Sequence, residues 1–217
     1  MADVFHHSFF LNGPAGRLEA MLWTAADPDP VITAVVCHPH PLFGGTMHNK
    51  VVFRAAKVLH GRGAPVLRFN FRGAGLSEGE HDQGRGEAED VRVALDFLAT
   101  EFPRVPLLLA GFSFGAWVGL RVGCGDGRVT ELVGLGIPAN DSDLSYLSAC
   151  TKPKLFLQGD RDQYGSRARV EALFAGLPEP KTLIFVSDAD HFFTGRLDEM
   201  AGAFDGWLAR QQEKIGK

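Results

Sequence analysis

Short apolar runs alternate along this chain with segments whose apolar residues recur at helical spacing, and this alternation limits the folds open to it. Runs typical of β-strands occupy residues 17–24, 31–37, 65–71, 105–112, 129–137, 154–159 and 182–187. Helical patterns occupy residues 49–61, 86–102, 114–123, 166–176 and 196–213. This order predicts an α/β fold with a mostly parallel, doubly wound sheet and helices on both faces.

The length of the chain and the spacing of these segments predict its domain organisation. We expect the 217 residues to form one α/β domain that spans residues 1–217. The connection over residues 138–153 has room only for a short helix at 142–149, so no cap domain is expected there. Because ligands of parallel sheets bind at the carboxyl ends of the strands, the chemistry is expected in the loops that follow strands.

Charge and composition exclude several classes of partner. A net charge of −4 without a basic stripe argues against a protein that binds nucleic acid. No run approaches the roughly 18 apolar residues of a membrane span, and the first residues lack the pattern of a signal peptide. The three cysteines show no metal-binding spacing, so we expect free thiols in a reducing compartment, the cytoplasm.

The segment Gly111-Phe112-Ser113-Phe114-Gly115 matches the pattern G-x-S-x-G and lies between an expected strand and an expected helix. At such a sharp turn the serine hydroxyl is exposed at the edge of the sheet, and the N–H of the next residue faces the same point. A glycine-rich turn whose serine only caps the helix is the alternative. The context favours Ser113 as a nucleophile, with the backbone N–H of Phe114 as one oxyanion donor.

A serine hydroxyl needs a general base, and His191 is the candidate. Of the eight histidines it is the one in the first loop after the last expected strand, in the segment SDADHFF. A surface histidine that pairs with Asp188 or Asp190 is the alternative interpretation. The position of the loop favours His191 as the base.

The imidazole in turn needs a carboxylate that fixes its tautomer. The loop after residues 154–159 offers Asp160 and Asp162, in the segment QGDRD. We expect Asp162, because two residues beyond the strand let the chain turn before the carboxylate is presented. Asp160 is expected to shape that turn through its own backbone bonds.

Residues 38–45 (HPHPLFGG) follow the strand 31–37 and are expected to supply the second oxyanion N–H. Proline cannot donate, so the donor is expected to be His40, with Leu42 as the alternative. The side chains of His38 and His40 are expected to brace the loop. A metal site formed with His48 is not expected, because no carboxylate or cysteine cluster accompanies these histidines.

Substrate contacts are expected from apolar residues near these loops. The main candidates are Leu42, Phe43 and Phe192, and Phe114 and Phe193 are further ones, although each could equally belong to the core.

The glycine-rich segment 70–77 (NFRGAGLS) lacks the lysine and spacing of a phosphate-binding loop. We therefore expect Arg72 to tie loops together rather than hold substrate.

Several segments together carry a family resemblance: CHPHPLFGGTMHNKVV, RFNFRGAGLSEG, GEAEDVRVALDFL, GFSFG, QGDRD and DADHFF. They resemble the small, lidless bacterial α/β-hydrolases, which are distantly similar to dienelactone hydrolase and to acyl-peptidase catalytic domains. The resemblance covers nearly the whole chain and implies Ser113 as nucleophile, Asp162 as acid and His191 as base. Dienelactone hydrolases proper are expected to have a cysteine at the position of Ser113, so dienelactone is not the expected substrate.

These features predict a serine hydrolase of the carboxylesterase type that cleaves small acyl esters through an acyl-enzyme and needs no cofactor. An acyltransferase, or a peptidase or amidase, could use the same apparatus. A non-catalytic binding protein on a hydrolase scaffold would have no need of Ser113, Asp162 and His191 together. The natural substrate and the oligomeric state stay open at this point.

Overall fold

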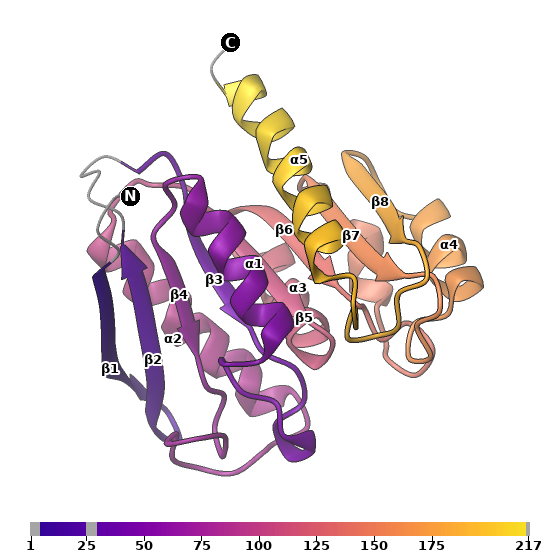
Figure 1. Ribbon diagram of the computed structural model, residues 1–217. Helices are drawn as coiled ribbons and strands as arrows, with labels where there is room; N and C mark the ends of the chain where they lie inside the picture. The colour runs from indigo at the N-terminus through magenta and orange to yellow at the C-terminus, as the bar shows by residue number, and fades with distance from the viewer. Residues whose placement is uncertain (1–4, 25–29, 216–217) are drawn as a thin grey trace.

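The computed structural model describes residues 5–24 and 30–215, and an eight-stranded sheet forms its centre (Figure 1). Across the sheet the strands follow the order β1-β2-β4-β3-β5-β6-β7-β8. They are β1 (Phe5–Gly13), β2 (Gly16–Thr24), β3 (Thr33–Cys37), β4 (Val66–Phe69), β5 (Leu107–Phe112), β6 (Val129–Leu135), β7 (Lys154–Gly159) and β8 (Lys181–Val186). All pairs from β4 to β8 are parallel, whereas β2 is antiparallel to both of its neighbours. The mostly parallel sheet predicted from the sequence is confirmed.

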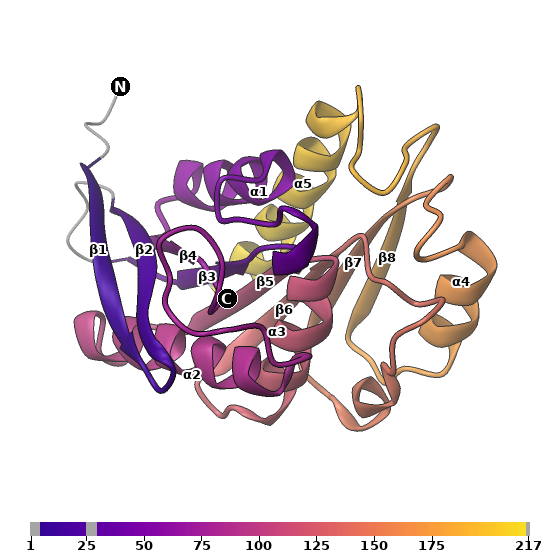
Figure 2. The same cartoon turned by 90° about the horizontal axis from the view of Figure 1, so that it is seen from below.

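Helices cover both faces of this sheet, as the alternation predicts (Figure 2). One face carries α1 (Lys50–Gly61) and α5 (Leu197–Ile215), which also pack against each other. The other face carries α2 (Arg85–Glu101), α3 (Phe114–Gly125) and α4 (Arg167–Ala175).

Successive residues of the central strands divide between the two cores. In β5, Leu107 and Leu109 pack with the helices α2 and α3, whereas Leu108 and Ala110 pack with α1 and α5. Every residue of β5 is therefore buried. Burial on both faces explains why the run is continuously apolar rather than alternating.

The edge strand β1 is a departure from the sequence-based expectation. Its sequence FHHSFFLNG mixes polar and aromatic residues and shows no clean period. An edge strand pairs on one side only and is partly exposed to solvent. Burial therefore requires a less regular alternation of apolar and polar residues in it. Two expected strands are also shorter than expected, since β4 ends at Phe69 and β6 at Leu135, and the residues beyond them belong to loops.

The chain between β6 and β7, all of it described, contains one short element, the 3-10 helix η2 (Ser145–Ala149). An α-helix was expected over 142–149, but the Asp143 carboxylate accepts a hydrogen bond from the Ser145 N–H and holds the chain in a turn up to that point. No cap domain is inserted here, as expected. Among the helices of the described ranges, none is both long and apolar enough to cross a lipid bilayer.

Candidate active site

Ser113 occupies the sharp turn between β5 and α3. Its φ of 55° and ψ of −118° are rare for an L-residue, and such conformations cost about 1–3 kcal/mol and cluster at functional sites. Glycines on both sides permit the turn: a Cβ at Gly111 would come closer than 3.0 Å to the Gly115 carbonyl, and a Cβ at Gly115 would come as close to the His38 carbonyl. The turn therefore exposes the serine and lies directly against the loop after β3.

His191 and Asp162 reach Ser113 from the loops after β8 and β7. The Nε2 atom of His191 lies 2.9 Å from Ser113 Oγ. Its Nδ1 atom lies 2.7 Å from Asp162 Oδ2. The imidazole and the carboxylate are buried, while the serine is partly exposed. The structure thus brings together the three residues expected from the sequence, in an order that allows the hydroxyl to pass its proton to the imidazole.

Three further hydrogen bonds hold the Asp162 carboxylate. Oδ1 accepts from the backbone N–H groups of Tyr164 at 2.8 Å and Gly165 at 3.1 Å. Oδ2 accepts from the side-chain amide of Gln158 at 2.7 Å. Sequence reasoning missed Gln158, whose one signal was a polar side chain near the end of a buried run.

The neighbouring acidic residues have other partners. Asp188 forms an ion pair with Arg161, and Asp190 accepts hydrogen bonds from two N–H groups of its own loop. The Asp160 N–H donates to the last carbonyl of β8, while its side-chain Oδ1 is buried and meets no donor within the described residues. The alternative pairings of His191 with Asp188 or Asp190 are therefore absent from the described chain.

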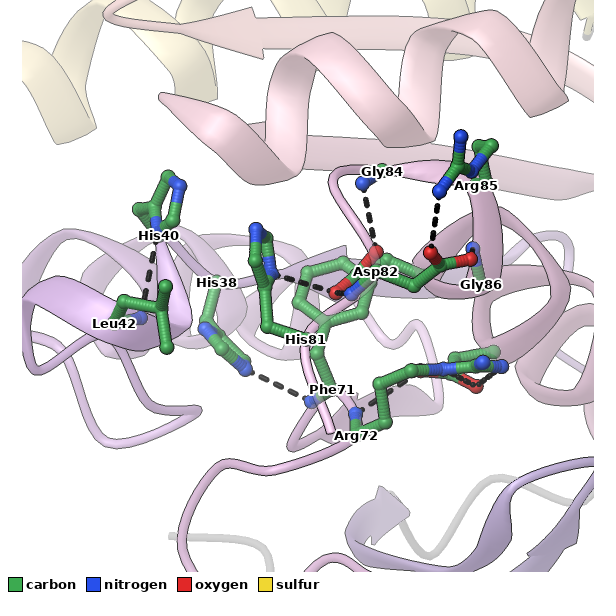
Figure 3. A network of polar contacts seen from close by, with 12 residues as sticks. His38, His40, Leu42, Phe71, Arg72, His81, Asp82, Gly84, Arg85 and Gly86 are labelled. Atoms are coloured by element: carbon green, nitrogen blue, oxygen red, sulfur yellow. Dashed lines mark hydrogen bonds and ion pairs between the residues drawn. The ribbon is translucent and has the colours of Figure 1, made fainter. Parts of the chain in front are cut away.

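His38 braces the loop after β3, as expected. Its Nδ1 lies 2.6 Å from the Pro39 carbonyl, and its Nε2 accepts a hydrogen bond from the Phe71 N–H at 2.9 Å (Figure 3). Burial of the ring lowers the pKa of His38 to about 3, so the imidazole is neutral and can donate at one nitrogen and accept at the other. The loops after β3 and β4 are joined through this ring.

The two candidates for the second oxyanion donor differ in their surroundings. The Leu42 N–H donates to Nδ1 of His40 at 3.3 Å, so it is directed at a ring nitrogen. Among the backbone hydrogen bonds of residues 5–24 and 30–215, none has the N–H of His40 or Phe114 as its donor. Neither N–H group therefore has a backbone acceptor within the described residues.

A cleft of about 530 Å³ opens over Ser113, a size at which pockets enclose whole small molecules. Five aromatic side chains contribute to its apolar wall: Phe43, Phe114, Trp117, Tyr164 and Phe192. Polar side chains, among them His40, His81, Asn49 and Gln83, line part of it.

The apolar residues expected to contact substrate fall into two groups. Phe43, Phe114 and Phe192 line the cleft. Leu42 does not line it: on the 3-10 helix η1 (Pro41–Phe43) successive side chains point in different directions, and that of Leu42 points away from the cleft that Phe43 lines. Phe193 does not line the cleft either, because it is fully buried in the core with α5.

Arg72 has the tying role expected for it. Its guanidinium lies 2.7–3.1 Å from the buried carboxylate of Asp90 on α2, and its backbone N–H donates to the same carboxylate (Figure 3). Within the described ranges, no group of three or more His, Cys, Asp or Glu side chains is arranged to hold a metal ion.

Comparisons with known proteins add to this description. The model of a family described as an alpha/beta hydrolase domain matches residues 34–207. An uncharacterized protein of Rickettsia prowazekii is 38% identical over 208 residues, which cover 92% of this chain and 87% of that protein. A protein of unknown function from Agrobacterium tumefaciens has a TM-score of 0.91 at 34% identity, covering 96% of this chain and 97% of that one. For a serine hydrolase without a lid from Xanthomonas campestris, the TM-score is 0.87 at 36% identity, over 95% of this chain and 94% of that one. The chain belongs to the α/β-hydrolase family.

Proposed function

We propose that the protein is a serine hydrolase of the carboxylesterase type that cleaves small acyl esters. The observation that carries this proposal is the unbroken series of contacts from Ser113 Oγ through His191 to Asp162, of which Ser113 and His191 line the cleft. The serine hydrolase without a lid from Xanthomonas campestris, similar along nearly the whole chain, supports the same reaction class.

In the proposed reaction, Ser113 Oγ attacks the ester carbonyl carbon while His191 Nε2 takes the hydroxyl proton. Asp162 holds the proton of the imidazole on Nδ1 and stabilises the imidazolium that forms. His191 then returns the proton to the leaving alcohol, and the acyl group stays on Ser113. A water molecule, deprotonated by the same imidazole, hydrolyses the acyl-enzyme and frees the acid.

The negative charge on the carbonyl oxygen needs donors that are in place before the reaction. The N–H groups of Phe114 and His40 are proposed for this role. Phe114 begins α3, so the helix dipole adds to the effect of its N–H. Close packing of Gly115 against the His38 carbonyl keeps the two loops together.

The shape of the cleft supports the proposed substrate class. Its aromatic wall, formed by Phe43, Phe114 and Phe192 among others, suits a small acyl group. The chain between β6 and β7 inserts no cap over it, so a long acyl chain would extend into solvent.

The proposal also includes a single domain and a cytoplasmic location. The family match over residues 34–207 supports one domain across residues 1–217. The three cysteines are free thiols, which supports a reducing compartment such as the cytoplasm.

The deciding experiment combines covalent labelling with turnover. A fluorophosphonate probe should label the wild-type protein and fail to label Ser113→Ala, because only an activated serine displaces fluoride. The 4-nitrophenyl esters of short acids should be hydrolysed, and Ser113→Ala should lose about 10³-fold or more in kcat. Ser148→Ala is the matched control, because Ser148 is exposed on η2 and does not line the cleft.

The result that overturns the proposal is ester hydrolysis by Ser113→Ala within tenfold of wild type. A set of matched anilides, and alcohols added as competing acceptors, then separates an esterase from an amidase or an acyltransferase.

A further inference from the structure

Two histidines outside the proposed catalytic group line the cleft, and the mechanism does not use their side chains. His40 lies in the loop after β3, and His81 lies in the loop before α2. Their ring centroids are 4.7 Å apart, and both rings pack on Phe114, at 4.8 Å for His40 and 5.5 Å for His81. Phe114 directly follows the proposed nucleophile, so the pair lies next to the reacting atoms.

The hydrogen bond of His40 determines which of its nitrogens carries the proton. Its Nδ1 accepts the Leu42 N–H at 3.3 Å and therefore has no hydrogen of its own. In the neutral ring the proton is then on Nε2, which can donate. Burial lowers the pKa of His40, and this effect favours that neutral form.

In His81 the surroundings place the proton on the other nitrogen, Nδ1. Its Nδ1 lies 2.7 Å from Oε1 of Glu87, a fully buried carboxylate. The contact is bent away from the direction of the ring N–H. Even so, a nitrogen lone pair would be repelled by a carboxylate oxygen at this distance, so the proton is on Nδ1. In a ring that carries this single proton, Nε2 is an acceptor.

Glu87 is fixed in place, so it holds this arrangement of His81. Its Oε1 accepts the Asp82 N–H at 2.9 Å and its Oε2 accepts the Gly84 N–H at 2.8 Å, at the first turn of α2. In Figure 3 the rings of His40 and His81 stand side by side, and the second nitrogen of each ring points to the same side, away from the contacts described above. The wall therefore presents one donor and one acceptor next to each other.

A hydroxyl group matches this pair, because it both donates and accepts a hydrogen bond, whereas an ether or a methylene cannot do both. We propose that His40 and His81 form a subsite for a hydroxyl group on the acyl part of the substrate. This inference rests on the proposed function and narrows its substrate class to esters of hydroxylated acids.

The acyl part, rather than the leaving group, is assigned for a geometric reason. The leaving-group oxygen must stay near His191, which has to return a proton to it. In the described structure the ring of His191 contacts Phe112, Tyr164 and Phe192, and none of these rings contacts His40 or His81. The two histidines therefore lie along a different wall from the one that the leaving group must follow.

The test compares pairs of 4-nitrophenyl esters that differ in one group: hydroxy acids of increasing chain length and their methyl ethers. We expect wild type to prefer the hydroxy ester of one length by about tenfold in kcat/KM, the effect of one or two net hydrogen bonds. In His81→Phe, which keeps a ring on Phe114 but loses the acceptor, the preference should fall to about one. His81→Gln, which restores an acceptor, should regain part of it. The exposed His48 does not line the cleft, so His48→Gln should keep the full preference.

Equal kcat/KM within every ester pair in wild type would overturn the subsite and leave the hydrolase proposal standing. A preference for hydroxyl groups only in the leaving alcohol, tested with diol monoesters and their methyl ethers, would also overturn it. If no ester is turned over, calorimetry measures the Kd of the free hydroxy acids and of their methyl ethers for the same variants. The ratio of the two Kd values then gives the preference for the hydroxyl group. Failure of the hydrolase proposal is thereby distinguished from failure of the subsite.

Discussion

The side-chain amide of Gln158 donates a hydrogen bond to the same Asp162 oxygen that lies 2.7 Å from His191 Nδ1. Gln158 is fully buried, and its carbonyl oxygen accepts the Ile137 N–H at 2.9 Å. One side chain at the end of β7 therefore joins the loop after β6 to the carboxylate that orients the imidazole.

This relationship predicts a positioning role for Gln158. Gln158→Leu should lower kcat on a short neutral ester by about tenfold, with a smaller change in KM, because Asp162 loses one of the bonds that hold it. The free energy of unfolding should fall by about 1–3 kcal/mol, since the buried Ile137 N–H loses its acceptor. Gln163→Leu, at an exposed position in the loop after β7, is the control. A folded Gln158→Leu with wild-type kcat would mean that the N–H groups of Tyr164 and Gly165 suffice.

The two acids of the loop after β7 should differ sharply. Asp162→Asn should lose on the order of 10⁴-fold in kcat, as loss of the orienting carboxylate does in serine proteases. Asp160→Asn should keep most activity, because only the backbone of Asp160 is tied to β8. Steady-state kinetics on one short ester measures both variants. The reverse ranking would move the acid to Asp160.

Some parts of the site could be predicted from the sequence because they depend on local order along the chain. Ser113 follows a buried strand and precedes a helix, and His191 and Asp162 occupy the first loops after two further strands. Strands of a parallel sheet end at one edge, so these loops meet.

Other parts could not be predicted, because they depend on contacts between distant segments. Gln158 contacts the loop after β6, and His81 contacts a carboxylate within α2. Neither contact produces a regular pattern of polar and apolar residues along the sequence. The strand β1 could not be predicted, because a strand that pairs on one side only does not require alternating apolar and polar residues. That Phe43 rather than Leu42 lines the cleft has a related cause: the 3-10 turn of η1 decides which of two adjacent apolar side chains faces the cleft.

The open cleft predicts weak selectivity among long acyl chains. Each of the first methylenes of a 4-nitrophenyl ester should raise kcat/KM by up to about fourfold, the equivalent of about 0.8 kcal/mol. Beyond the aromatic wall of Phe43, Phe114 and Phe192, further methylenes stay in water, so the increase should level off. A series from acetate to palmitate, measured below and above the micelle threshold, tests this. A jump in rate above that threshold would mean that a described loop moves as a lid.

The neutral, buried ring of His38 predicts a loss of stability in mild acid. Its pKa is lowered to about 3 by burial, whereas in the unfolded chain an imidazole titrates near its ordinary value of about 6.5. Between these values the unfolded chain binds a proton that the folded protein does not, so the free energy of unfolding falls as the pH falls. From pH 7 to pH 5 the contribution of this one group is about 2 kcal/mol. Urea unfolding at the two pH values measures it.

The matched variants isolate this contribution from that of other titrating groups. His38→Gln should be less stable at pH 7, because the link between Pro39 and Phe71 is lost, but its stability should depend less on pH by about the same 2 kcal/mol. His48→Gln, an exposed site in the same region, should keep the wild-type dependence. If the free energy of unfolding depended equally on pH in wild type and in His38→Gln, the folded protein would also bind the proton at His38. A protonated ring cannot accept the Phe71 N–H, so the loops after β3 and β4 would then have to separate, next to the proposed oxyanion donor.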